Sequence, residues 1–366
     1  MSGSSSKYST QGKNSAELAL PVHLIRAVAI IIVIVIHASD VYSYSLQVPR
    51  DVLSWWVTNV FKSVGYLGVP LFVILSGTLL LNPSKTDEPL RVFFQKRLTR
   101  IALPFLFWGA AYFAYRRFTN HEIVTFDSIW RGFLGSYPYP YSHFWFLFML
   151  IGLYLVTPIL RVVVAHASSK ILRYFILLWF LGTAIMPILG RFALFYLGSG
   201  ILIVSGWVGY FMLGAYLRTI HVRSRIVYAL VLVSGVLWTA VGTCFLTFAS
   251  GYLDQFFYDY LSANVILASV GLFMFLYRAP VNGFESRFPW ANRLLRQVGL
   301  CSFAIYLFHS MVLGILGEKG LFGFNLGIIM LNPILGIPLL SLVTLIVSFG
   351  AVWLLRKVPM LNKAIG

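Results

Sequence analysis

Two residues that could do chemistry, Arg26 and His37, stand at the ends of the stretch RAVAIIIVIVIH, with ten apolar residues between them. Eleven helical steps bring a side chain back to within about 20° of its starting direction and advance it roughly 16 Å along the axis. Because a charge facing lipid costs about 3 kcal/mol or more, both side chains should face a bundle interior. A guanidinium suits an anionic ligand, and an imidazole suits proton transfer near neutral pH. The alternative is an arginine and a histidine that only extend to the membrane interfaces.

A basic pair opens the stretch RLTRIALPF, in which Arg97 and Arg100 are three residues apart and therefore neighbours on a helix. In a membrane-spanning chain they would lie on the same side as Arg26. Three arginines at one mouth suit a phosphorylated ligand, because guanidinium groups bind phosphate oxygens bidentately. Coenzyme A, with its three phosphates, fits this description. The alternative is that these residues only anchor the chain on the cytoplasmic side.

Late in the chain, Ser302, Tyr306 and His309 fall on one helical stripe, which should face the interior of an apolar bundle. Ordinary hydrogen bonding between helices would explain this stripe equally well. His143 and Trp145 begin an earlier apolar stretch, on the side predicted for His37. His143 could help to shape an acceptor pocket, whereas an interfacial aromatic belt accounts for Trp145 adequately.

Carboxylates and cysteines limit the chemistry further. Asp40 lies three residues after His37 and could orient its imidazole, although a capping or loop role is the simpler interpretation. None of the eleven Asp and Glu residues lies deep in an apolar stretch, which argues against a proton-coupled transporter. The two cysteines, Cys244 and Cys301, are too few for a disulfide framework or a CxxC metal site, and we expect no metal.

Composition indicates what must position these residues. The 366-residue chain is 59% hydrophobic and only 11% charged, whereas a soluble domain has about a quarter charged residues. Such a chain cannot cover a water-facing surface, so the sequence predicts an all-α, polytopic bundle in the membrane. The net charge of +17 is then explained by basic cytoplasmic loops, and we expect no nucleic-acid partner.

Ten stretches are long enough to cross a bilayer core of about 30 Å. They lie near residues 21–40, 64–81, 101–118, 142–160, 171–190, 200–217, 226–249, 261–278, 299–317 and 331–355. Residues 53–63 suggest a short interfacial helix, since Trp55 and Trp56 suit the headgroup region. In the second stretch, Ser76 and Gly77 are expected to permit close helix packing.

The distribution of Lys and Arg predicts the orientation. With the N-terminus in the cytoplasm, 20 of the 28 basic residues lie inside, 7 lie outside, and Arg26 lies within the first span. This split favours cytoplasmic N- and C-termini. An even number of spans agrees, because it puts both termini on the same side of the membrane. The polar, Ser-rich residues 1–16 are expected to form a disordered cytoplasmic tail, and residues 17–366 one transmembrane domain.

Several of these stretches together resemble the acyltransferase family 3 membrane proteins. The resemblance extends over about residues 20 to 355 and rests on the Arg-x10-His spacing and on the segments VPLFVILSGTLL, FFQKRLTRIALPF, HFWFLFMLIGLYLVTPIL and SFAIYLFHS. The fourth-span segment is most similar to bacterial inner-membrane O-acetyltransferases of surface glycans, of the enterobacterial common antigen type. The resemblance therefore implies a multi-pass protein of a prokaryotic plasma membrane.

The resemblance also implies roles for individual residues. An acyl group, with acetyl as the default, would pass from cytoplasmic acyl-CoA to a hydroxyl of a cell-surface glycan or lipid-linked sugar. The implied assignments are donor binding by Arg26, Arg97 and Arg100, catalysis by His37, Tyr306 and His309, and acceptor binding by His143 and Trp145. Some relatives carry an added soluble esterase-type domain, which the sequence up to Gly366 does not contain, so we expect direct acylation or a second protein.

Two other classes of function remain open at this stage. Some relatives are thought to export glycans or lipid-linked intermediates, and ten helices around a polar channel would suit an exporter that transfers no acyl group. Release of free CoA that depends on the acceptor distinguishes the enzyme from the exporter. A membrane sensor or scaffold is the third class, and the lack of an added soluble domain in this sequence disfavours it.

Overall fold

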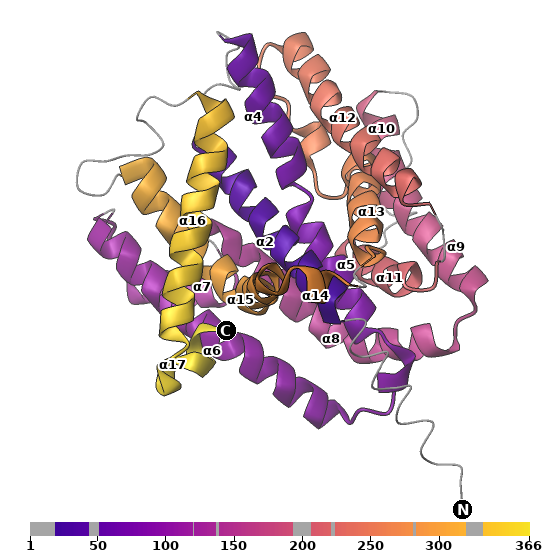
Figure 1. Cartoon of the computed structure of the whole chain (residues 1–366), viewed down its shortest axis with the longest axis horizontal. Helices are drawn as coiled ribbons and strands as arrows, with labels where there is room; N and C mark the ends of the chain where they lie inside the picture. The colour runs from indigo at the N-terminus through magenta and orange to yellow at the C-terminus, as the bar shows by residue number, and fades with distance from the viewer. Residues whose placement is uncertain are drawn as a thin grey trace, which may run out of the picture.

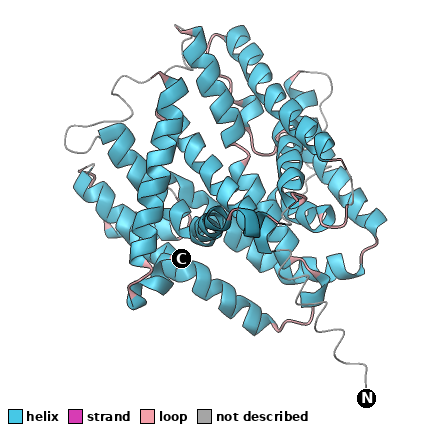
Figure 2. Cartoon of the chain, in the orientation of Figure 1, coloured by secondary structure: helices cyan, strands magenta, loops and turns pink. Residues whose placement is uncertain are grey.

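All regular secondary structure in the described part of the chain is helical (Figure 2). The computed structural model describes residues 19–43, 51–119, 121–136, 139–192, 206–220, 224–280, 283–319 and 332–366. The tail predicted over residues 1–16 lies outside this range. The polytopic helical fold predicted from composition is confirmed.

Eleven helices of twelve or more residues build the described bundle: α2 (Ala19–Asp40), α4 (Val52–Gly65), α5 (Gly68–Leu80), α6 (Leu90–Thr119), α8 (Trp145–His166), α9 (Ser169–Phe180), α11 (Gly206–Leu217), α12 (Arg225–Ser250), α13 (Ala263–Tyr277), α15 (Pro289–Leu313) and α16 (Pro333–Leu355). Shorter elements connect them: η1 (Pro83–Lys85), α7 (Phe126–Phe133), η2 (Ser142–Phe144), η3 (Leu181–Ile185), α10 (Met186–Arg191), η4 (Phe256–Tyr258), α14 (Phe284–Arg287), η5 (Gly314–Lys319) and α17 (Pro359–Ile365).

Within the described residues, eight helical segments rather than ten are long and apolar enough to cross a membrane. They are Leu20–Asp40, Val52–Leu80, Ser142–His166, Ser169–Arg191, Arg225–Ser250, Phe256–Tyr277, Pro289–Gly317 and Pro333–Leu355. The predicted span 101–118 falls on α6, where basic residues near both ends lower the mean hydropathy. The predicted span 200–217 includes α11, which has only twelve residues, and its first six positions lie outside the described range.

Helix α4 packs within the bundle, which corrects the expectation of a peripheral interfacial helix. It contacts α2, α12 and α16, and Trp55 is only 1% exposed. Its buried face carries Thr58, Asn59 and Ser63, and the Asn59 amide donates to the Ala240 carbonyl at 2.9 Å. A helix with a polar face can lie inside a membrane protein when its neighbours satisfy those polar groups. The two tryptophans alone could not distinguish this arrangement from an interfacial one.

Helix α2 lies in the middle of the assembly, with α12 and α13 to one side and α6, α16 and α17 to the other (Figure 1). It packs most extensively on α15. Gly299 of α15 permits this close approach, because a Cβ there would come within 2.6 Å of the His23 carbonyl oxygen. The consequence is that polar residues of α2 and α15 lie opposite each other along the pair.

Helices α5 and α11 show a second close contact, which confirms the predicted packing role of Gly77. A Cβ at Gly77 would lie 1.9 Å from the Phe211 carbonyl oxygen, and the Thr78 hydroxyl donates to the Gly214 carbonyl at 2.8 Å. Small residues let helix backbones approach and bond in this way inside membranes. Ser76, by contrast, is directed into a cavity beside α2.

Candidate functional site

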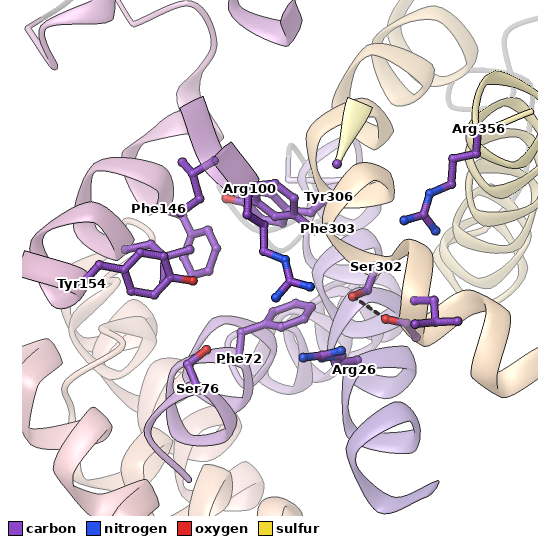
Figure 3. A pocket seen from close by; sticks show the side chains of 15 residues that line it. Arg26, Phe72, Ser76, Arg100, Phe146, Tyr154, Ser302, Phe303, Tyr306 and Arg356 are labelled. Atoms are coloured by element: carbon purple, nitrogen blue, oxygen red, sulfur yellow. Dashed lines mark hydrogen bonds between the residues drawn. The ribbon is translucent and has the colours of Figure 1, made fainter. Parts of the chain in front are cut away.

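A cavity of about 220 Å³ opens between α2, α5, α6, α8 and α15 (Figure 3). Its lining includes two sets of side chains. The polar set is Arg26, Ser76, Arg100, Tyr154, Ser302, Tyr306 and Arg356, and the aromatic or aliphatic set is Phe72, Ile101, Phe146, Leu150, Leu300 and Phe303. No Asp or Glu side chain is part of this lining. The cavity therefore combines an apolar lining with three arginine side chains that could bind an anion.

Three arginines from different helices contribute to the cavity. Arg26 comes from the first turns of α2, Arg100 from α6, and Arg356 from the residue that caps α16 (Figure 3). Arg356 donates from Nη1 to the Cys301 sulfur at 3.2 Å, and its buried Nε has no hydrogen-bond partner among the described residues. The sequence pattern did not single out Arg356, which was only one of the basic residues counted on the predicted cytoplasmic side.

Arg97 does not line this cavity, although the RxxR spacing had grouped it with Arg26. It faces an adjoining open basin of about 780 Å³, which Lys96, Arg100 and Lys363 also line. Its guanidinium lies 5.5 Å from the Phe93 ring centre and 5.8 Å from that of Tyr154. Arg100 belongs to both spaces, so the basin and the cavity share one cation. We call this region, with Arg26, Arg97, Arg100, Arg356 and Lys363, the arginine end.

Three imidazoles gather at the other end of the α2–α15 pair. The His37 ring centre lies 5.2 Å from that of His309, which in turn lies 5.4 Å from that of His143. His143 and His309 are buried, whereas the His37 side chain is 32% exposed. The sequence predicted each of these histidines separately as a site residue, and the structure brings them together. We call this group, with Tyr306, the histidine end.

Hydrogen bonds hold the buried part of the histidine end in place. The Tyr306 hydroxyl donates to the His143 carbonyl oxygen at 2.7 Å, and His309 Nδ1 lies 2.6 Å from the Tyr306 carbonyl oxygen. His309 Nε2 lies 3.2 Å from the Ser310 hydroxyl oxygen. The polar atoms of Tyr306 and His309 are thus engaged by protein groups, while the His37 side chain is partly exposed.

Asp40 and Lys62 support His37 from the side. Asp40 Oδ2 lies 3.4 Å from His37 Nδ1, and its other carboxylate oxygen pairs with the Lys62 ammonium. Lys62 comes from the buried face of α4 and is 7% exposed. A carboxylate at Nδ1 favours the imidazole tautomer that carries its proton there and leaves Nε2 as the proton acceptor. The orienting role considered for Asp40 is geometrically favoured, and Lys62 is a component that the sequence did not indicate.

The cavity and the histidine end meet at a pair of aromatic rings. Tyr306 and Phe146 line the cavity, and their ring centres lie 4.9 Å apart. The Tyr306 ring centre also lies 5.7 Å from that of His309, whereas His37 itself does not line the cavity. A ligand that fills the cavity from the arginine end would therefore end against these rings, beside the imidazoles.

Trp145 packs into an aromatic group next to the histidines. Its ring centre lies 5.5 Å from that of Trp207 and 5.6 Å from that of Tyr260. All three side chains are partly exposed. The described residues contain no cluster of three or more His, Cys, Asp or Glu side chains that could hold a metal ion.

Comparison with known proteins places the chain in a family. No curated protein and no solved structure matches it. The model of acyltransferase family 3, which describes an acyltransferase domain, matches residues 22–353. The match includes the whole histidine end and, apart from Arg356 and Lys363, the arginine end. On this match, which extends over nearly the whole chain, the protein belongs to acyltransferase family 3 and is a membrane acyltransferase.

Proposed function

We propose that the protein transfers an acyl group, acetyl in the simplest case, from acyl-CoA to a hydroxyl of a cell-surface glycan or lipid-linked sugar. The observation that carries this proposal is the cavity that begins at three arginines and ends at Tyr306, beside three clustered imidazoles. It supplies an anion-binding entrance and a proton-transfer group at the two ends of one pair of helices. The expected orientation puts the arginine end at the cytoplasm, in the inner membrane of a prokaryotic cell.

The donor would occupy the basin and the cavity in sequence. The basin, with the unpaired Arg97, Arg100 and Lys363, suits the phosphates of the nucleotide part, because guanidinium and ammonium groups bind phosphate oxygens through charge-assisted bonds. The narrower cavity suits the uncharged pantetheine arm. An extended arm of roughly 15–20 Å, counted by bonds, matches the rise of roughly 16 Å from Arg26 to His37.

His37 would act as the general base. Its Nε2 accepts the proton of an acceptor hydroxyl while that oxygen forms a bond to the thioester carbonyl carbon. Collapse of the tetrahedral intermediate then breaks the carbon–sulfur bond, and the imidazolium returns the proton to the departing CoA thiolate. The products are the ester and free CoA, so atoms and charges balance without a metal or a redox partner. Asp40 and Lys62 act as positioning residues through the His37 ring.

Tyr306 and His309 receive positioning roles in this scheme. The only proton of the Tyr306 hydroxyl is donated to the His143 carbonyl, so it is not available to an oxyanion. His309 lies against the His37 ring and fixes its orientation from the α15 side. His143 closes the same group from the start of α8. The acceptor would approach the exposed side of His37 and would also contact Trp145, which follows His143 by two residues.

The decisive experiment measures transfer of a labelled acetyl group and release of free CoA in the same reaction. The purified protein in liposomes is given acetyl-CoA labelled in the acetyl group and a glycan extract from the envelope of its source cells. We expect label in the glycan and an equal amount of free CoA, both dependent on added glycan. Movement of unlabelled glycan across the liposome membrane without release of CoA would instead support the exporter and refute acyl transfer.

A further inference from the structure

A group of four aromatic side chains lies beside the histidine end, where Trp145 contacts Phe146, the ring that packs on Tyr306. Its members, which we call the aromatic wall, are Tyr66, Trp145, Trp207 and Tyr260. The ring of Tyr260 stands in the centre, 5.0 Å from that of Tyr66, 5.6 Å from that of Trp145 and 5.7 Å from that of Trp207. They come from the end of α4, the starts of α8 and α11, and the turn between η4 and α13, so the fold assembles the wall from four separate segments.

Stacking and hydrogen bonds hold Tyr66 and the Tyr260 backbone in place, although the rings of the wall are partly exposed. Tyr66 stacks on buried Tyr258 at 5.0 Å and 12°, and the Tyr258 hydroxyl donates to Asn59 Oδ1 at 2.6 Å. The Tyr260 carbonyl accepts from the Tyr210 hydroxyl at 2.6 Å. A partly exposed aromatic surface that needs no rearrangement loses little conformational entropy on binding a ligand. Packing against lipid alone does not require such a set of fixed polar anchors behind the rings.

Two carboxylates border this wall. Asp259 directly precedes Tyr260 in the chain, and Asp40 pairs with Lys62, whose ammonium lies 6.0 Å from the centre of the Tyr258 ring on which Tyr66 stacks. Asp259 is exposed, and only its Oδ1 is engaged, by the Leu261 backbone N–H at 2.7 Å. Carboxylate oxygens accept strong hydrogen bonds from hydroxyl groups. The nearby Lys62 ammonium is buried and already paired with Asp40, so it does not offer a free positive charge to an acidic ligand.

We propose that the aromatic wall is the acceptor subsite and takes an uncharged sugar ring. The apolar C–H face of a pyranose stacks on Trp207 and Tyr260, one hydroxyl is directed at His37, and the Asp259 carboxylate accepts a bond from another hydroxyl. The unpaired Asp259 carboxylate repels uronic and other acidic sugars. This inference rests on the proposed transfer to a carbohydrate, and it adds the class of sugar and the surface that selects it.

The test measures sugar binding directly, through quenching of tryptophan fluorescence in the protein reconstituted in liposomes. The probes are the methyl pyranosides of glucose, galactose, mannose and N-acetylglucosamine, and sodium glucuronate as the acidic counterpart. We expect saturable quenching by at least one uncharged pyranoside, with an affinity about tenfold or more above that of glucuronate, because like charges at close range disfavour binding. Equal or tighter binding of glucuronate, or no pyranoside binding at all, would overturn the inference.

Substitutions locate the binding on the wall. Trp207→Ala should weaken pyranoside binding about tenfold, and Trp207→Phe should recover most of it, since a flat ring is retained. Asp259→Asn should improve glucuronate binding relative to the pyranosides. Trp130→Ala, which changes an exposed tryptophan of α7 outside the wall, is the matched control and should leave binding unchanged. If Trp207→Ala binds sugar as the unsubstituted protein does, the wall is not the subsite.

The outcomes separate this inference from the proposed function. If pyranoside binding depends on Trp207 but CoA release does not depend on the acceptor, the sugar subsite is supported and acyl transfer is refuted. If Trp207→Ala transfers the acyl group with an unchanged acceptor KM, the enzymatic function is supported and the sugar subsite is refuted. In the expected case, Trp207→Ala raises the acceptor KM about tenfold and leaves the acetyl-CoA KM unchanged.

Discussion

The basic side chains at the arginine end stand without carboxylate partners, whereas most of those predicted on the opposite side of the membrane are paired. None of the ion pairs among the described residues involves Arg26, Arg97, Arg100, Arg356 or Lys363. On the opposite side, Lys62 pairs with Asp40, Arg116 with Glu122, Arg131 with Asp127 and Arg191 with Asp254.

This difference follows from what each end has to bind. A cation that already holds a carboxylate gains little from a phosphate, so an anion site needs cations that no protein group neutralises. A general base needs the reverse, because nearby free cations would disfavour protonation of the imidazole during the reaction. Neutralised charges, buried imidazoles and aromatic rings at the histidine end meet that requirement. We therefore expect substitutions at the two ends to affect different kinetic constants.

The largest effect should come from the histidine end. His37→Gln should lower kcat by about 10³-fold, because the amide cannot accept the hydroxyl proton, while the acetyl-CoA KM stays unchanged. Steady-state release of CoA in liposomes with the glycan extract measures both constants. His166→Gln, at an exposed position near the end of α8, is the control and should behave as the unsubstituted protein does. A His37 variant with near-native turnover would remove the base from the mechanism.

Substitutions at the arginine end should weaken binding of the acetyl-CoA donor. Arg100→Ala should raise the acetyl-CoA KM about 100-fold with little change in kcat, because Arg100 belongs to both the basin and the cavity. Arg97 lines the basin and not the cavity, so Arg97→Ala should raise the acetyl-CoA KM about tenfold. Higher salt should weaken donor binding by both Arg97 and Arg100. The paired and exposed Arg131 supplies the control, Arg131→Ala. A fall in kcat of the same size in Arg100→Ala would break the division between the two ends.

The sequence predicted the parts of this site that depend on one helix, and it missed those that depend on how helices pack. The eleven-residue spacing placed Arg26 and His37 on one face of α2, and the structure directs both toward α15. Arg356 joins Arg26 at the cavity only because α16 returns to the arginine end, more than 300 positions later in the chain. Lys62 reaches Asp40 only because α4 is buried against α2. No periodicity within a segment encodes such encounters.

A smaller loss of kcat is expected when the Asp40 carboxylate, which positions His37, is replaced. Asp40→Asn should lower kcat roughly 20-fold and leave the acetyl-CoA KM unchanged, because an amide can favour the wrong tautomer of the imidazole without removing the base. Asp40→Glu should recover part of this loss, since it restores the carboxylate, and this rescue separates positioning from a structural defect. Asp127→Asn changes an exposed carboxylate of α7 and serves as the control. If Asp40→Asn and Asp40→Glu are equally active and near-native, Asp40 does not position His37.

The smallest effect tests a cation near the arginine end that does have a partner. Arg161 is 2% exposed and donates from Nη1 to Glu88 at 2.9 Å and from Nε to the Leu80 carbonyl at 2.7 Å, so it should contribute to stability and not to donor binding. Hydrogen bonds from Lys96 and Arg161 hold the pKa of Glu88 below its usual value. A group with a lowered folded pKa stabilises the fold above its unfolded pKa, about 4.3 for Glu, and this contribution disappears as the pH falls through the folded value.

Glu88→Gln should therefore lower the free energy of unfolding by about 1 kcal/mol at pH 7 and leave the acetyl-CoA KM unchanged. The difference from the unsubstituted protein should shrink as the pH falls below about 4, because the protonated Glu88 carboxyl and the amide that replaces it in the variant are both uncharged. Thermal unfolding in detergent at pH 7 and at successively lower pH measures this convergence. A donor KM that rises with Glu88→Gln as much as with Arg97→Ala would mean that paired cations also bind the donor, and the contrast between free and neutralised charge would no longer explain the two ends.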